Sequence, residues 1–403
     1  MPIRHKVKRS LLIALCVIAL PFQTGCWSKD EIEDQSIYVG MGLDPASETE
    51  LEKELRSKGS DYLKRKLLTY TLQIINVQTE SQHSGGQSPT SQKPYYNISE
   101  TGDSMFQLIR EFSTRMERPV IGHHLKVIVI NEKLSRKYSM NELLDFFLRD
   151  NDIRPSCLVL ISKGSARSTL IAKDKSIIPS FRLSGLVDNR YRSLNILEPM
   201  SLSKLEGKIH GEQSYLLQNV IAADGEVKFS GGAVIKGKTQ KLQGLLNEEE
   251  TIGCVWLTGK GEGGLVKSYH EDNHQPIVYE VKSMKSKIDA KVAGDEISFH
   301  VSIKSKGRLI EEWLNNNEPI DPAFKKQAEV GSQKEVRRLT NMALKKLQKQ
   351  YGTDVLGFGK QLSIQHPRKW EKIKDRWEEM FPDIPITVSI DMEITEYGAK
   401  ITR

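Results

Sequence analysis

The stretch from Leu11 to Trp27 constrains this chain most, because it fixes where the folded part can begin. Four basic residues and no acidic residue precede it, and the ten residues Leu11 to Leu20 are all apolar. As a helix these ten residues would rise about 15 Å, roughly half of a hydrocarbon core, so they are too short to span a bilayer. A basic segment followed by a short apolar run is typical of an export signal. We therefore expect residues 1–25 to be a signal peptide outside the fold.

Cys26 is the expected end of that signal. Thr24 and Gly25 lead into it, as in bacterial lipoprotein signals, where the cysteine receives a lipid such as palmitate and becomes the mature N-terminus. Gln23 stands where these signals usually carry leucine. We predict Cys26 as the lipid attachment site, and hence a lipid-anchored membrane protein. The alternative is an uncleaved N-terminal anchor with Cys26 as an ordinary thiol.

The charge and the cysteines of the chain indicate which kinds of partner and which cross-links are to be expected. The formal charge of +7 comes from 59 basic and 52 acidic residues, and removing the signal leaves a balance of +3. This weak, dispersed charge does not favour nucleic acid as a partner. Cys157 and Cys254 are far apart and lie in apolar, strand-like runs, so we expect buried free thiols and not a disulfide framework. With 403 residues, the chain is long enough for two or three domains.

Strands and helices alternate in the first half of the chain, which predicts mixed sheets with packed helices, an α+β or mixed α/β fold. We place the boundary of this N-terminal region (26–211, with two subdomains as an alternative) before a C-terminal α+β domain at 212–403. The expected strands of the N-terminal region are 67–77, 125–130 and 157–162. The expected helices are 104–116, a helix starting at the capping box Ser139/Glu142, and 164–173.

The C-terminal region is expected to open with hairpins and to close on a strand. Its predicted strands are 227–236, 244–246, 253–257, 277–292, 296–305 and 386–394, with Gly294-Asp295 as one hairpin turn. A capping pair, Ser332 and Glu335, predicts a long helix at 332–351 that stops at Gly352. Another helix is expected near Pro367, with Trp370 and Trp377 on one buried stripe.

His270, Glu271 and His274 spell H-E-x-x-H, the pattern that places two zinc-binding histidines and a glutamate base on one helix. The pattern needs a helix, and here glycines precede it and Gln275-Pro276 follow it. We therefore interpret it as a solvated loop without a metal. The zinc-dependent hydrolase built on these residues is kept as an alternative.

Three further groups of polar residues are candidates with plain structural interpretations. His123 and His124 adjoin a strand, so we expect one inside the fold and one at the surface. The charged residues Asp150, Asp152 and Arg154 are interpreted as caps and surface pairs. Four basic residues on the long helix, which could attract anionic headgroups or an acidic partner, are interpreted as a solvated face. They are Lys334, Arg338, Lys345 and Lys349.

Several stretches in order resemble the Ger(x)C family, the C-subunit lipoproteins of nutrient germinant receptors in endospore-forming bacteria. The stretches are GCWSKDEIEDQSIYVGMGLD (25–44), GHHLKVIVI (122–130), LRDNDIRPSCLVLISKGSA (148–166), GGAVIKGKTQKLQGLLNEEETIGCVWLTGK (231–260), DVLGFG (354–359) and HPRKWEKIKDRWEEMFPDIPITVSIDMEI (366–394). The resemblance implies three mixed α/β domains and a non-enzymatic, acylated subunit without a cofactor. It also implies a place on the outer face of the inner spore membrane, beside membrane-embedded A and B subunits.

From sequence we thus expect a lipid-anchored germinant-receptor subunit that is needed for the germination response to nutrients and carries no catalytic or metal-binding residues. Whether this subunit touches the nutrient is left open. A solute-binding lipoprotein is a further alternative, beside the zinc hydrolase.

Overall fold

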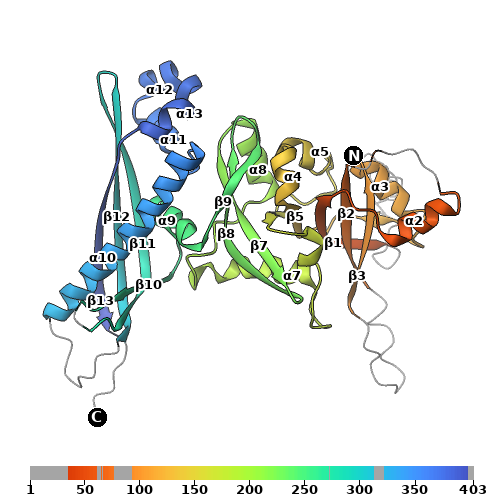
Figure 1. Cartoon of the computed structure of the whole chain (residues 1–403), viewed down its shortest axis with the longest axis horizontal. Helices are drawn as coiled ribbons and strands as arrows, with labels where there is room; N and C mark the ends of the chain where they lie inside the picture. Colours follow the sequence, from red (N-terminus) through yellow and green to blue (C-terminus); the bar gives the residue numbers. More distant parts are fainter. Residues whose placement is uncertain are drawn as a thin grey trace, which may run out of the picture.

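The computed structural model describes residues 35–60, 65, 67–76, 93–271, 273–312 and 322–397. The predicted signal and Cys26 lie outside these residues. Two β-sheets stand at opposite ends of an elongated molecule, each with its own helices (Figure 1). This confirms the predicted fold class of mixed sheets with packed helices.

The first sheet has the strand order β3-β2-β1-β5-β6-β7-β8-β9, with the short β4 paired to β1. Its strands β1, β5 and β6 run parallel, and antiparallel pairs extend it on both sides. All five residues of β5 are buried, as expected of an apolar run in the middle of a covered sheet. The strands are β1 (Ser36–Pro45), β2 (Leu68–Ile75), β3 (Tyr95–Gly102), β4 (Val120–Ile121), β5 (Val127–Asn131), β6 (Leu158–Ser162), β7 (Tyr215–Ala223), β8 (Glu226–Lys236) and β9 (Lys241–Leu246).

Short capped helices cover this sheet. Ser139 and Glu142 form the predicted capping box of α5, and the Ser104 hydroxyl caps α3 by accepting from the backbone N–H of Gln107. The helix predicted at 164–173 is shorter in the structure. It is the single turn α6, and Leu170 is the residue that caps its end. The helices are α2 (Glu50–Ser57), α3 (Met105–Phe112), α4 (Glu132–Lys137), α5 (Met140–Arg149), α6 (Ala166–Thr169), α7 (Pro179–Leu186) and α8 (Leu202–His210), with the 3-10 helix η4 (Val187–Tyr191).

The second sheet has the order β10-β11-β12-β13. Its long strands β11 and β12 form a hairpin whose turn contains Gly294 in the left-handed conformation, as predicted. One face of the sheet buries apolar side chains against helices, and the opposite face carries mostly polar side chains. The elements are β10 (Gly264–Tyr269), β11 (Pro276–Ala293), β12 (Glu296–Glu312), β13 (Ile386–Tyr397), α9 (Glu248–Thr258), α10 (Pro322–Lys345), η5 (Lys346–Tyr351), α11 (Phe358–Gln365), α12 (Pro367–Ile373), η6 (Lys374–Arg376), α13 (Trp377–Met380) and η7 (Phe381–Asp383).

The strand predicted at 253–257 is wrong, because these residues lie in the middle of α9. Asn247 and Glu250 form a capping box that starts this helix, and Gly259 ends it in the left-handed conformation. Gly253 to Leu257 are all buried, so the run is apolar on every side of the helix. A short run of this kind has no periodicity that separates a strand from a buried helix.

The long helix starts earlier than its predicted cap. α10 begins at Pro322, and Ser332 lies fully buried inside it. The buried side of the helix, with Val336 and Leu339, continues toward the N-terminus through Ala328, so packing extends the helix to residues before Ser332. Gly352, with a φ of 57°, ends the following η5 turn as expected.

A shared apolar core joins the two ends of the molecule. Val234 and Leu246 of the first sheet, with Leu197 of the segment before α8, pack in one cluster with residues of α9 and the second sheet. The first sheet continues past residue 211, since β6 pairs with β7. The division of the chain between 211 and 212 stays a prediction.

Candidate functional site

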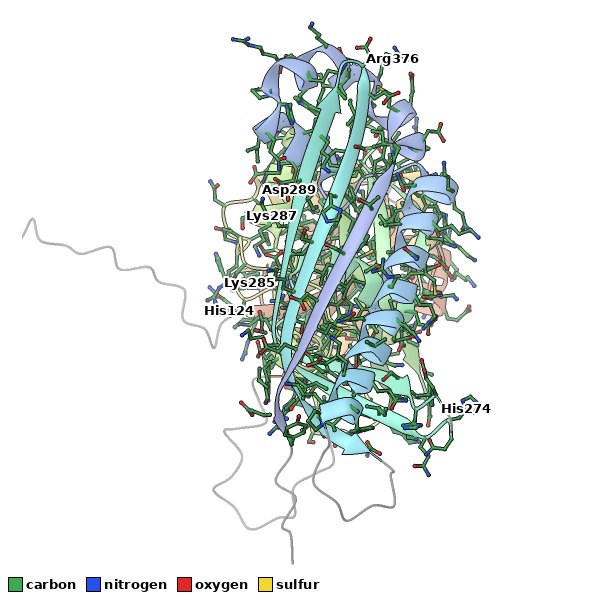
Figure 2. All side chains as sticks on the ribbon, turned by 90° about the vertical axis from the view of Figure 1, so that its left-hand side faces the viewer. His124, His274, Lys285, Lys287, Asp289 and Arg376 are labelled. Carbon is green, nitrogen blue, oxygen red and sulfur yellow. The ribbon has the colours of Figure 1, made fainter. Side chains whose placement is uncertain are left out.

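The H-E-x-x-H residues lie in the turn between β10 and β11, not on a helix. The backbone N–H of His270 donates to the Gln275 carbonyl at 2.9 Å, and His274 has a φ of 55°. Figure 2 shows His274 at an outer corner of the molecule. Within the described residues, no three His, Cys, Asp or Glu side chains are grouped to hold a metal ion. As far as the turn is described, His270 and His274 therefore do not lie on one helical face, as the H-E-x-x-H pattern requires.

Side chains of the turn bind neighbouring elements. Glu271 forms an ion pair with Lys334 of α10 at 2.6 Å, and Lys334 lowers the pKa of the Glu271 carboxyl. The His270 ring stacks on Phe324, with 6.3 Å between ring centroids. A carboxylate held by a lysine, with a lowered pKa, is poorly suited to act as a general base.

The structure brings two groups of predicted candidates together at the start of β5. His123 Nε2 lies 3.3 Å from Asp152, and Arg154 lies 3.3 Å from His124 Nδ1. His123 is exposed and His124 half-buried, so the expectation that one of them lies inside the fold is wrong. Burial, and then the positive charge of Arg154, lower the pKa of His124. Both residues precede β5 in a turn, where strand alternation does not apply.

Most of the predicted basic face, which lies on α10 and η5, is neutralised within the molecule. Lys334 pairs with Glu271, and Arg338 pairs with Glu249 and Glu335 at 2.6 and 2.8 Å. Lys349 pairs with Asp383 at 2.8 Å. This face consequently has little charge left for an anionic headgroup, which favours its structural interpretation.

Both described cysteines are buried and unpaired. Burial raises the pKa of the Cys157 and Cys254 thiols, so neither is a nucleophile at neutral pH. Cys254 lies in α9, so its predicted strand setting is wrong, whereas its burial is confirmed.

A polar cluster that sequence reasoning missed ties the ends of three parallel strands together. The Asp44 carboxylate, at the end of β1, accepts from Asn131 Nδ2 at 2.9 Å and from the backbone N–H groups of Ala166 and Arg167, each at 2.8 Å. Asn131 also donates to the Gly164 carbonyl at 2.8 Å. Parallel sheets often bind ligands at this edge. Here these groups satisfy one another, so the cluster serves structure.

Two open pockets on the described surface have charged residues in their linings. One, of about 340 Å³, lies beside the start of β1 and includes Tyr96, Arg115 and Arg118 in its lining. The Arg115 guanidinium in it is already paired with Glu100. The other, of about 520 Å³, lies between the first sheet and the start of α9, with Lys163 and Glu248 in its lining. In the second pocket the Ser230 hydroxyl donates to Glu248 Oε1 at 3.1 Å, but the same oxygen is held by Lys228 at 2.6 Å, which makes the carboxylate a poor base.

These features define a class: a two-sheet mixed α/β protein whose described candidate residues act in packing and ion pairing. None of the described helices is both long and apolar enough to cross a bilayer.

Comparison with known proteins places the chain within that class. "Spore germination protein N-terminal domain" matches residues 28–221, and "Spore germination B3/GerAC like, C-terminal" matches residues 230–398. Spore germination protein YndF of Bacillus subtilis (strain 168) is 42% identical over 99% of this chain and 100% of its own length. Spore germination protein B3 of the same organism is 28% identical over 96% of both chains. The crystal structure of the GerBC protein superposes with a TM-score of 0.60 at 26% identity, covering 83% of this chain and 96% of that one. The chain belongs to the GerAC-like family of spore germination proteins.

Proposed function

We propose that this protein is a lipid-anchored, non-enzymatic subunit of a spore germinant receptor, needed for the germination response to nutrients. The observation that carries the proposal is full-length similarity to relatives named spore germination proteins, at 42% identity for the YndF protein. In this proposal Cys26 carries the lipid, and the folded body lies on the outer face of the inner spore membrane. Membrane-embedded A and B subunits are its proposed partners.

The chemistry of the described residues supports a role without catalysis. Glu271 is held by Lys334, both described thiols are buried, and the Asp44 carboxylate is occupied by four hydrogen-bond donors. A nucleophile needs an adjacent base and access to a substrate, and these groups lack one or both. The geometry of the β10–β11 turn argues against the zinc hydrolase.

The test of the proposal is chemical and uses Cys26→Ala in the full-length chain. Mass spectrometry of membrane-extracted protein should find a lipid on an N-terminal Cys26. Cys26→Ala should lose this modification. Because two or more acyl chains anchor a protein stably, the variant should also leave the membrane fraction and impair germination with a nutrient.

Cys16→Ala is the matched control, because it removes a thiol from the same signal and should retain the lipid. An unmodified Met1 start, or cleavage elsewhere than before Cys26, would overturn the anchor. Normal nutrient germination in spores lacking the protein and its close relatives would overturn the receptor role.

A further inference from the structure

The outer face of the second sheet is a large described surface with no helix packed on it. Figure 2 looks onto this face, and no helix lies in front of β11, β12 and β13. Side chains alternate along the strands, so Phe299, Val301 and Ile303 point into the core, while His300, Ser302 and Lys304 point outward. A polar open face of this length is available to another molecule.

Four lysines form a basic strip along the middle of this face: Lys285, Lys287, Lys304 and Lys306. Lys287 pairs with Asp289 at 2.7 Å, and Lys306 pairs with Glu393 at 3.0 Å. Lys285 lies directly opposite Lys304 in the antiparallel register, and neither forms an ion pair with another described residue. Like charges in directly opposed positions of a sheet destabilise it. On its other side Lys304 lies opposite Asp391 of β13, so Lys285 is the lysine of the pair without an acidic residue opposite it. An acidic ligand would relieve the repulsion between the two lysines.

An apolar patch lies on the same face at the β10 end. We define it as Leu265, Tyr269, Val278 and Ile310. The side chains of Leu265, Tyr269 and Ile310 are 58%, 54% and 45% exposed. On β10, Lys267 lies between Leu265 and Tyr269, and Val278 of β11 lies directly opposite Lys267. Exposed apolar clusters bordered by polar residues mark interaction surfaces. From Val278 to Lys285 an extended chain covers about 23 Å, so one short segment could reach both features.

The charge pattern favours a protein over a lipid surface. Strand β13 carries three acidic residues on the same face as the basic strip: Asp391, Glu393 and Glu396. A uniformly anionic bilayer would attract the lysines but repel these carboxylates. A protein segment can place acidic residues only over the lysines, so it matches the face better.

We propose that the open face of β11–β13 docks a protein segment that carries acidic residues beside an apolar anchor. The acidic residues pair with Lys285 and Lys304, and the anchor covers Leu265, Tyr269 and Ile310. Binding at this face does not depend on the lipid anchor. Only the identification of the segment as part of a receptor rests on the proposed function.

The first experiment measures binding of a defined probe to the full-length protein. The probe is a fluorescein-labelled peptide of about twelve residues, with Phe and Leu at one end and four Glu at the other. We expect K285E/K304E to weaken its binding about tenfold, because both cationic contacts become repulsive. L265S/Y269S should weaken it as well. All four side chains are exposed, so both double variants should still fold. K304E faces Asp391 of β13, so thermal unfolding of K285E/K304E should fall only slightly.

K53E/K58E is the charge-matched control. It changes the net charge equally on α2 and at Lys58, the residue that follows this helix, at the opposite end of the molecule (Figure 1). Equal loss of peptide binding in this control, or no binding by the unmodified protein, would overturn the proposal. Loss of binding to phosphatidylglycerol vesicles in K285E/K304E, with peptide binding unchanged, would assign the face to the membrane instead.

The second experiment separates this inference from the proposed function. Spores carrying K285E/K304E should germinate poorly with nutrient, while mass spectrometry still finds lipidated Cys26. If Cys26 is not lipidated but the peptide still binds through Lys285 and Lys304, the anchor fails and the docking face stands. Normal germination of K285E/K304E spores, in a strain whose deletion mutant is defective, would show that receptor function does not use this face.

Discussion

Asp354 and Trp377 are joined by a hydrogen bond from the indole Nε1 to the carboxylate at 3.2 Å, although 23 residues separate them. The same carboxylate accepts from the backbone N–H groups of Gly357, Phe358 and Gly359 at 2.8, 3.1 and 2.7 Å. Burial raises the pKa of the Asp354 carboxyl, and these four hydrogen bonds act in the opposite direction. One side chain thus sets the start of α11 and ties it to α13.

Replacing Asp354 with Ala should lower the free energy of unfolding by about 3 kcal/mol, because buried donors lose their acceptor. The measurement is chemical denaturation of the purified protein. Asp354→Asn is the control, since it keeps one acceptor oxygen and should cost less. Equal stability of the Ala variant and the unmodified protein would contradict the role of this carboxylate.

Trp377 and Trp370 should differ in their contribution to stability. Their rings meet edge to face with 5.5 Å between centroids, but Trp377 is 7% exposed and Trp370 is only half-buried. We expect Trp377→Ala to cost about 3–5 kcal/mol and Trp370→Ala clearly less. Thermal unfolding of both variants is the test. A larger loss for Trp370→Ala would reverse this order.

Replacing Glu271 with Gln should leave nutrient germination unchanged. The Glu271–Lys334 ion pair is exposed, and such pairs contribute about 0–1 kcal/mol. Lys334→Gln should have the same small effect on the melting temperature. Abolished germination with a normal amount of Glu271→Gln protein would revive a catalytic role for the turn, as would bound zinc in stoichiometric amount.

Glu198 should make stability sensitive to acid. It accepts hydrogen bonds from Lys260 and Lys204 at 2.8 and 3.0 Å, which lower its pKa from 4.5 to about 2. A lowered carboxyl pKa in the folded state stabilises the fold above pH 4.5, and this contribution is lost as the pH falls toward 2.

Glu198→Gln is the test of that contribution. The difference in melting temperature between this variant and the unmodified protein should be largest near neutral pH and should shrink between pH 4.5 and about 2. A difference that stays constant over this range would exclude the carboxylate charge as its cause.

Local chemistry determined several elements that the sequence alone predicts. The capping box Ser139/Glu142, the Gly294 turn and the helix stop at Gly352 each depend on residues within one turn of the chain. Their side chains or backbone angles satisfy groups a few residues away, so neighbours in sequence suffice to specify them. Alternating apolar residues likewise predicted β13, because the period of a strand is local. The export signal is equally local, and its cleavage before Cys26 stays a prediction.

Tertiary structure decided the rest, because it depends on groups far apart in the chain. The run at 253–257 is a helix because apolar partners surround it on all sides, and α10 starts before Ser332 because packing carries it further. The contacts of Asp44 with Ala166 and of Glu271 with Lys334 span 122 and 63 residues. No local pattern encodes such pairs. They exist only once the two sheets and their helices have brought the side chains within hydrogen-bonding distance.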